Sequence, residues 1–286
     1  IRAQNEGATR LVLLGRKAAD AAERSDLAIT PGYAHLFPHP NRLTTALPLT
    51  AVDPERLAEA AGRWRERLAG WRSPRIAVLV GGRSGQFDLD AATARQLGED
   101  VAAMSRQLGG TVMATTSRRT GSRQTAALRE ALGAGHRVHA WEAGSPDNPY
   151  LGLLALGDLF VVTGDSESML AEALAVGRPV FLYPLPERPS FAVLQRPRRW
   201  VLARARSRRL GERGSELPQR GIPYLAARLI DRGFVRPTRD LGALHEELVA
   251  GGFAQRFGDP VRWGNARRVT DLAAAASRVR ALMGIR

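Results

Sequence analysis

Short apolar runs alternate with helix-like stretches in one regular series from residue 75 to residue 185. Each run has the length and composition of a strand buried on both faces, and each intervening stretch is long enough for a crossover helix. Strands joined in this way pair in parallel, with right-handed crossovers. The series therefore predicts the α/β class with a doubly wound parallel sheet, whose strands are expected at 75–80, 111–116, 137–141, 159–163 and 179–183.

Capping residues set the expected helix boundaries. Asp53 can cap a helix that begins at Pro54 and runs to Trp71, because proline suits the first helical position. Asp90 can cap the next helix, which the pair Gly109-Gly110 ends. Further helices are expected at 124–132, 150–156 and 166–176.

The region before residue 73 shows the same alternation of strand-like and helix-like stretches. Strands are expected at 11–15, 27–30 and 43–49, with a helix at 16–24. The pair Ser73-Pro74 breaks the pattern and is the best candidate for a domain boundary. The chain opens at Ile1 without a methionine, so we expect an N-terminal portion to be missing.

The pattern changes again after Tyr183. The prolines at 184, 186, 189 and 197 predict a loop, and helices are expected at 223–232, 241–250 (capped by Asp240) and 269–283. The chain is therefore expected to comprise a partial N-terminal half (1–72), a second half (73–185), and a basic loop with C-terminal helices (186–286).

Composition excludes several classes of chemistry. The absence of cysteine rules out disulfides, thiolate-bound zinc, iron–sulfur clusters and a cysteine nucleophile. Lys17 is the single lysine and no GxxxxGK[ST] string occurs, which argues against Schiff-base chemistry and a P-loop. No set of residues has a convincing metal-ligand spacing, so neither a metal nor a resident cofactor is expected. No apolar stretch reaches the length of a membrane span.

The net charge is +14, with 42 basic and 28 acidic residues, and nearly all the basic residues are arginine. A GC-rich genome accounts for this preference, and so does an anionic partner. Seven arginines within 196–209, interrupted by Trp200, predict either a surface that docks on anionic lipid or a solvated face paired with acids elsewhere. Too few aromatic residues lie among them to indicate specific nucleic-acid binding.

Three loops are expected at the carboxyl ends of strands, where open parallel sheets bind ligands. In the first, glycines let backbone amides approach a phosphate, although the same residues also suit a tight turn; it contains Gly81, Gly82, Arg83, Ser84 and Gly85. The second contains Ser117 and Arg118, which can bind phosphate or simply lie in solvent.

The third loop leads into the helix expected at 166–176. Asp165, Ser166 and Ser168 lie where free amides and the helix dipole favour an anion, although aspartate and serine here are also ordinary helix caps. Glu172 lies in the second turn, where its carboxylate can accept hydrogen bonds from sugar hydroxyls or face solvent.

Four ordered strings make the chain recognisable. They are IAVLVGGRSG (76–85), TTSRRT (115–120), NPYLGLLAL (148–156) and VVTGDSESMLAEALAVGRP (161–179). On these strings the chain, from about Leu11 to Ala250, resembles the mitochondrial-fission family named for elongated mitochondria in plants, which has many bacterial members.

The region 75–185 also resembles the nucleotide-binding half of GT-B glycosyltransferases, in particular the N-acetylglucosaminyltransferase that makes the last peptidoglycan lipid precursor. That resemblance implies a GT-B-like fold of two Rossmann-like halves, the first incomplete here. It implies that Gly81–Gly85 hold phosphate and that Glu172 contacts ribose, although Arg83 stands where that family tends to have serine.

Two functions follow from these resemblances. The first is a metal-independent glycosyltransferase-like protein that binds a nucleoside diphosphate or nucleotide-sugar and acts at a membrane surface; no catalytic base is identified. The alternative is a non-catalytic, membrane-associated adaptor of the fission family. Either protein is expected to be cytoplasmic and, where it docks, peripheral on the inner face of the membrane.

Overall fold

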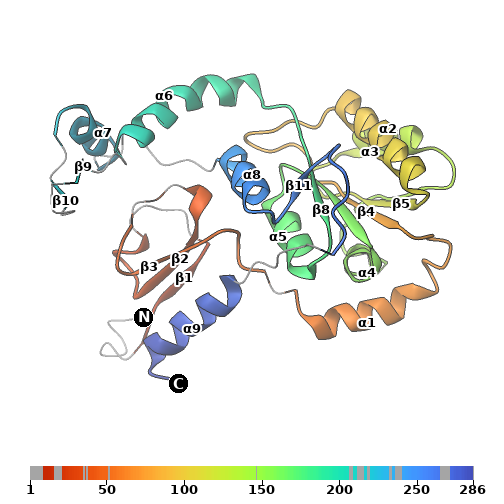
Figure 1. Ribbon diagram of the computed structural model, residues 1–286, viewed down its shortest axis with the longest axis horizontal. Coiled ribbons are helices and arrows are strands. Elements are labelled where there is room, and N and C mark those ends of the chain that lie inside the picture. The colour runs from red at the N-terminus through yellow and green to blue at the C-terminus, as the bar shows by residue number, and fades with distance from the viewer. Residues whose placement is uncertain are drawn as a thin grey trace. The chain divides into compact units, whose positions relative to one another are not determined.

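The computed structural model of the chain describes residues 9–15, 21–34, 36, 38–50, 52–145, 147–205, 209–210, 216–217, 220–231, 234–235, 240–264 and 271–285. The chain divides into two compact units. Unit 1 contains residues 1–45, 188–240 and 275–286, and unit 2 contains residues 46–187 and 241–274 (Figure 1). Each unit contains its own parallel sheet, which confirms the mixed α/β class.

Within the described residues, six parallel strands form the sheet of unit 2 in the spatial order β11-β8-β7-β4-β5-β6. Their bounds are β4 (Arg75–Leu79), β5 (Thr111–Thr115), β6 (Arg137–His139), β7 (Leu159–Thr163), β8 (Val180–Tyr183) and β11 (Gln255–Arg256). Successive strands run outward from β4 in one direction and then from β7 in the other. The topological switch point, where such sheets bind ligands, therefore lies between β4 and β7.

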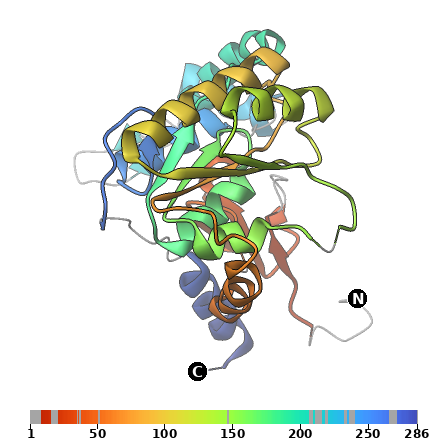
Figure 2. The ribbon, with the colours of Figure 1, turned by 90° about the vertical axis from the view of Figure 1, so that its right-hand side faces the viewer.

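Helices cover both faces of this sheet, which explains why its central strands are mainly apolar and, apart from Arg75, buried along their whole length. Helices α2 (Ala91–Leu108) and α3 (Ser122–Leu132) lie on one face, and α1 (Pro54–Arg65) and α4 (Tyr150–Leu156) lie on the other (Figure 2). Unit 2 also contains α5 (Glu167–Val176) and α8 (Leu241–Ala250).

The caps expected at Asp53 and Asp90 are present. The side chain of Asp53 accepts the N–H of Glu55 at 2.9 Å, and that of Asp90 accepts the N–H of Thr93 at 2.7 Å. Gly109 adopts φ +69° at the end of α2, the left-handed conformation that glycine tolerates best. Local sequence signals thus determine where both helices begin and where α2 ends. The expected end of the first helix at Trp71 is wrong, because α1 ends at Arg65.

Helix α1 belongs to unit 2, so the compact units divide between Thr45 and Ala46, before the boundary that the sequence predicts between residues 72 and 73. Trp64 of α1 packs so closely on Gly152 of α4 that a Cβ added to this glycine would lie 2.5 Å from the indole. Trp71 donates its indole N–H to the carbonyl of Thr111 at 2.7 Å. The segment from α1 to Trp71 therefore packs on unit 2, on the far side of the predicted boundary.

Unit 1 contains the three strands expected at the start of the chain: β1 (Val12–Leu14), β2 (Leu27–Pro31) and β3 (Arg42–Thr45). They pair in parallel in the order β1-β2-β3, and β2 is buried along its whole length. The helix expected at 16–24 falls largely on residues 16–20, which lie outside the described ranges. Helix α9 (Asp271–Met283) corresponds to the helix expected at 269–283.

The prediction of a loop from the four prolines is wrong over much of its length, because residues Pro189–Ala205 form helix α6, with Pro197 inside it. An internal proline removes one helical hydrogen bond. Packing compensates, since Val201 and Leu202 of α6 are buried against Ala226 of α7 (Ile222–Asp231). The pair β9 (Arg209–Leu210) and β10 (Glu216–Leu217) is antiparallel.

Gln86 joins the two points at which segment 188–240 leaves unit 2 and returns to it. Its amide N–H donates to Glu187 at 2.8 Å, and its carbonyl oxygen accepts the N–H of Leu241 at 3.0 Å. The side chain is buried.

Among the described helices, none has the length and apolarity that a membrane span requires.

Candidate functional site

The loops that follow β4 and β7 are bound together by one buried carboxylate. Asp165 accepts the N–H of Gly82 at 2.8 Å and the hydroxyl of Thr163 at 2.8 Å. The hydroxyl oxygen of Thr163 in turn accepts the N–H of Gly81 at 2.8 Å. Asp165 has no exposed surface. The loop Gly81–Gly85, called the glycine loop below, is therefore fixed by buried hydrogen bonds at the switch point of the sheet.

The loop after β5 joins the same arrangement. The hydroxyls of Ser117 and Thr120 both donate to the carbonyl of Gly81. Arg119 pairs with Asp165 at 2.9 Å and donates to the carbonyl of Arg83 at 3.3 Å. All three predicted loops thus meet at one edge of the sheet, which confirms that part of the sequence-based prediction.

The environment of Asp165 gives it a positioning role. Burial raises the pKa of this carboxyl above its ordinary value, and the hydrogen bond from Thr163 and the charge of Arg119 oppose that rise. Its two oxygens are occupied by contacts within the protein, so they are not available to a ligand. A Cβ at Gly81 would overlap the Asp165 carboxylate, and one at Gly82 would overlap the backbone of Arg119.

The predicted residues that remain exposed are mainly cationic. The Arg83 side chain is 64% exposed, with its nearest carboxylate, Asp88, 3.8 Å away. Arg118 is exposed and makes no hydrogen bond or ion pair among the described residues, whereas Arg119 is the partner of Asp165. Ser168 is also exposed.

The hydroxyls of the other predicted serines are less available. Ser84 accepts the N–H of Phe87 at 3.0 Å within its own loop, and Ser117 is engaged with Gly81. Ser166 occupies the N-cap position of α5, but its side chain accepts no hydrogen bond from the first turn. The amides at this helix start therefore lack the usual side-chain cap.

His245 is a residue of this edge that the sequence did not reveal. A Cβ added to Gly164 would lie 2.6 Å from its Cε1 atom, and its ring stacks on Phe87 with centroids 5.7 Å apart. Helix α8, which carries it, has the bounds that the sequence predicts. Nothing in the local pattern shows that this helix returns to the loops after β4 and β7.

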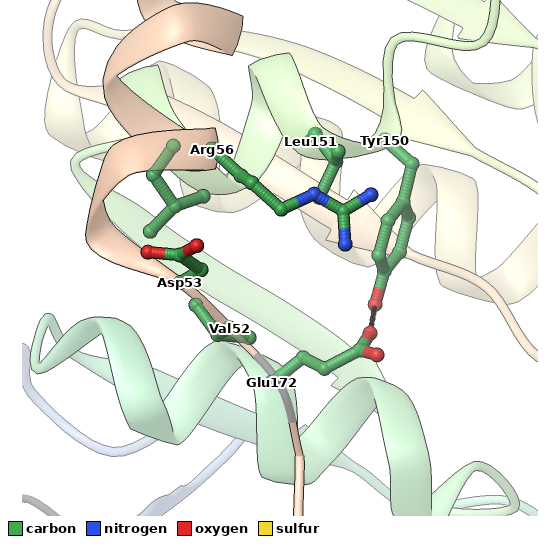
Figure 3. A pocket seen from close by; sticks show the side chains of 7 residues that line it. Val52, Asp53, Arg56, Tyr150, Leu151 and Glu172 are labelled. Atoms are coloured by element: carbon green, nitrogen blue, oxygen red, sulfur yellow. Dashed lines mark hydrogen bonds between the residues drawn. The ribbon is translucent and has the colours of Figure 1, made fainter.

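Glu172 lines a pocket of about 260 Å³ (Figure 3). The Tyr150 hydroxyl donates to its carboxylate. Burial raises the pKa of Glu172, and the hydrogen bond from Tyr150 offsets part of that rise. The pocket is lined by Val52, Asp53, Arg56, Leu57, Tyr150, Leu151 and Glu172.

Arg56 and Asp53 reach this pocket from α1 and were not among the residues predicted to form a site. Figure 3 shows the Arg56 guanidinium extending across the pocket toward Tyr150. Two carboxylates, one guanidinium and an aromatic wall match a polyhydroxyl group, which both donates and accepts hydrogen bonds. Sequence reasoning missed these residues because it assigned α1 to the other half of the chain.

Comparison with curated proteins gives one relative at the level of sequence. The chain is 34% identical over 140 residues to mitochondrial fission protein ELM1 of Arabidopsis thaliana, a match that covers 49% of this chain and 32% of that protein. The chain thus spans about a third of the length of this curated relative.

Comparison with solved structures gives more distant likenesses. Os79 from O. sativa, in complex with U2F and trichothecene, matches with a TM-score of 0.39 and 15% identity, covering 91% of this chain and 55% of that one. Phytolacca americana UGT2, complexed with UDP-2fluoro-glucose and pterostilbene, matches with a TM-score of 0.32 and 13% identity, covering 89% and 53%.

A family model extends the sequence relationship. The model described as mitochondrial fission ELM1 matches residues 1–196, which include β1 to β8 and all three loops at the switch point. This is more than half of the chain. The protein therefore belongs to the mitochondrial fission ELM1 family.

Proposed function

We propose that this protein binds a nucleoside diphosphate, free or as a nucleotide-sugar, at the carboxyl edge of the unit 2 sheet. The observation that carries the proposal is the buried Asp165, which holds the glycine loop and the loop after β7 together at the switch point. A preformed loop at this position, bordered by the exposed cations Arg83 and Arg118, is suited to an anionic ligand.

The two parts of the ligand would be recognised by different groups. The diphosphate would lie against the backbone amides of Gly81–Gly85 and the uncapped start of α5, with Arg118 neutralising charge. The ribose would occupy the pocket beside α1, where Glu172 accepts hydrogen bonds from its hydroxyls and Arg56 donates to its oxygens. Ser168 lies exposed near the helix start.

Two activities are compatible with such a site. In a metal-independent glycosyltransferase, the fixed positive charge of Arg83 and Arg118 would stabilise the departing nucleoside diphosphate. In a non-catalytic adaptor, the nucleotide would serve as a bound ligand without turnover. Membership of a mitochondrial fission family supports the adaptor. The uncapped start of α5 and the exposed Arg83 and Arg118 support the enzyme, because they would stabilise charge on a leaving diphosphate.

Action at an anionic membrane surface is a further part of the proposal. Its support is the excess of arginine in segment 188–240. Arg196 and Arg198 of α6 are described, whereas Arg206 and Arg208 lie outside the described residues, as does the side chain of Arg209.

Isothermal calorimetry tests the nucleotide site directly. UDP, GDP and ADP are titrated into the whole protein alongside uridine and inorganic pyrophosphate. We expect at least one nucleoside diphosphate to bind more tightly than either uridine or pyrophosphate, because each of these fills only half of the site. Absence of binding by all three diphosphates at millimolar concentration would overturn the proposal.

The same protein then separates enzyme from adaptor. Nucleotide-sugars are incubated with the protein and lipid extract, and release of nucleoside diphosphate is followed by phosphorus NMR. The glycosyltransferase is supported if nucleoside diphosphate is released and if Glu172→Gln and Arg118→Gln each slow that release. Binding without release supports the adaptor.

A further inference from the structure

Positive charge is concentrated in one part of the chain. Segment 188–240 contains fourteen arginines and four acidic residues, and so accounts for ten of the fourteen net positive charges of the protein. Genome composition alone would spread arginine along the chain. A local excess of this size instead indicates a surface that meets an anionic partner.

Helix α7, within this segment, is more apolar than its packing requires. Ala226 and Ile230 face α6 and are buried in the cluster that contains Val201 and Leu202. Ile222, Leu225 and Leu229 lie beside that buried face at helical spacing, yet they are 52%, 62% and 41% exposed. Phe234, just beyond the helix, is 75% exposed.

Trp200 adds an amphipathic group on α6. Its side chain is 52% exposed, and the Arg204 guanidinium lies 5.6 Å from its ring centroid. Exposed tryptophan beside arginine is typical of the headgroup region of a bilayer, where one end of each side chain is apolar and the other is hydrated.

We propose that α7 lies in the interface of an anionic bilayer, with Ile222, Leu225 and Leu229 inserted below the headgroups and arginines of α6 such as Arg196 and Arg198 bound to lipid phosphates. This inference rests on the proposed membrane action and names its structural element. A nucleic acid or an acidic protein would attract the positive charge of this segment but would leave Ile222, Leu225 and Leu229 exposed to water. A bilayer satisfies both, as for other short interfacial helices.

Vesicle flotation tests this surface. The whole protein is mixed with vesicles of phosphatidylcholine alone or with a third of phosphatidylglycerol, at low and high salt. We expect binding to the anionic vesicles only, and at least a tenfold weaker partition in high salt, because salt screens the arginines. Equal binding to both vesicle types, or no binding to anionic vesicles at low salt, would overturn the inference.

Two sets of variants separate insertion from charge attraction. Leu225→Gln/Leu229→Gln should reduce partition at least tenfold, and Arg196→Gln/Arg198→Gln should reduce it and weaken its salt dependence. The matched control is Leu272→Gln, since Leu272 is 55% exposed on α9, outside this segment. Undiminished binding of the double leucine variant would overturn insertion, as would equal losses from the control.

The absence of cysteine allows a readout that does not depend on affinity. A single cysteine at Leu225, labelled with an environment-sensitive dye, should shift to the blue on anionic vesicles, while the same label at Leu272 should not. An unshifted spectrum at Leu225 on bound protein would refute insertion. Glu172→Gln should bind vesicles as the unaltered protein does, so a failure here is distinguishable from a failure of the nucleotide site.

Discussion

Asp165, at the end of β7, accepts the backbone N–H of Gly82, at the end of β4, at 2.8 Å and with no exposed surface of its own. The contact joins the two halves of the sheet at the position where its strand order reverses. The loop that contains Gly81 and Gly82 is thereby fixed without a ligand, which would lower the ordering cost of the nucleotide binding proposed above.

Asp165→Asn should destabilise the fold while preserving its shape. The asparagine amide would turn a donor toward Gly82 or Thr163, each of which already donates, and it would leave Arg119 without its buried partner. Leaving one such buried group unsatisfied costs about 1–3 kcal/mol. Urea unfolding measures the loss, and an unchanged midpoint would contradict the positioning role.

The two ends of the glycine loop should respond differently to alanine. Gly82→Ala should lower the melting temperature and abolish diphosphate binding, because φ is +154° there and the new Cβ would overlap the Arg119 backbone. Gly85→Ala in the same loop should do neither, since nothing lies within 4 Å of its Cβ position. Differential scanning fluorimetry measures the melting temperature of both variants, and calorimetry measures their diphosphate affinity. Equal effects of the two substitutions would contradict the close contact of Gly82 with the Arg119 backbone.

Neighbouring arginines should separate binding from folding. Arg118→Gln should weaken UDP binding by about 1.5–3 kcal/mol, the scale of hydrogen bonds to charged groups, and leave uridine affinity and stability unchanged. Arg119→Gln should reduce stability, because Arg119 pairs with Asp165. Calorimetry and urea unfolding of both variants test the assignment, which reversed phenotypes would refute.

Acid should weaken nucleoside binding through Glu172. Because burial raises the pKa of this carboxyl, it takes up a proton at higher pH than the usual value of about 4.3 and then loses acceptor capacity toward ribose. Uridine affinity should therefore fall as the pH decreases from neutral, and the fall should begin at a higher pH than for an ordinary glutamate. Glu172→Gln should bind weakly at every pH, and a variant that keeps the same pH dependence would exclude this residue as its source.

The contact of α1 with α4 can be measured by a double-mutant cycle. Gly152→Ala should cost about 1–3 kcal/mol, because its Cβ would meet Trp64. In a Trp64→Leu background the same change should cost less, since the smaller side chain leaves room for the methyl group. Additive free energies of unfolding would show that the two residues do not meet.

Local pattern was sufficient for much of unit 2. The bounds of α4, α8 and β7 agree with those predicted, because α4 and β7 are distinct apolar runs and α8 lies between Asp240 and the pair Gly251-Gly252. The meeting of the three loops also follows from pattern, since parallel strands place their carboxyl ends at one edge.

Long-range packing accounts for what the sequence did not predict. Helix α6 passes through Pro197 because α7, more than twenty residues away, buries its apolar side chains. Arg56 reaches the Glu172 pocket only because Trp64 fits against Gly152. His245 reaches the switch point on a helix that follows the whole of segment 188–240. None of these pairings leaves a periodic signal along the chain.

Gln86 binds both Glu187 and Leu241, so segment 188–240 departs and returns at nearly one point on unit 2. A stretch whose two ends lie this close behaves as an exchangeable module, because its replacement does not reroute any strand of the host sheet. Changes that lengthen, shorten or recharge this stretch would therefore leave the loops after β4, β5 and β7 in place. On the functions proposed above, membrane attachment would change while nucleotide binding stayed the same.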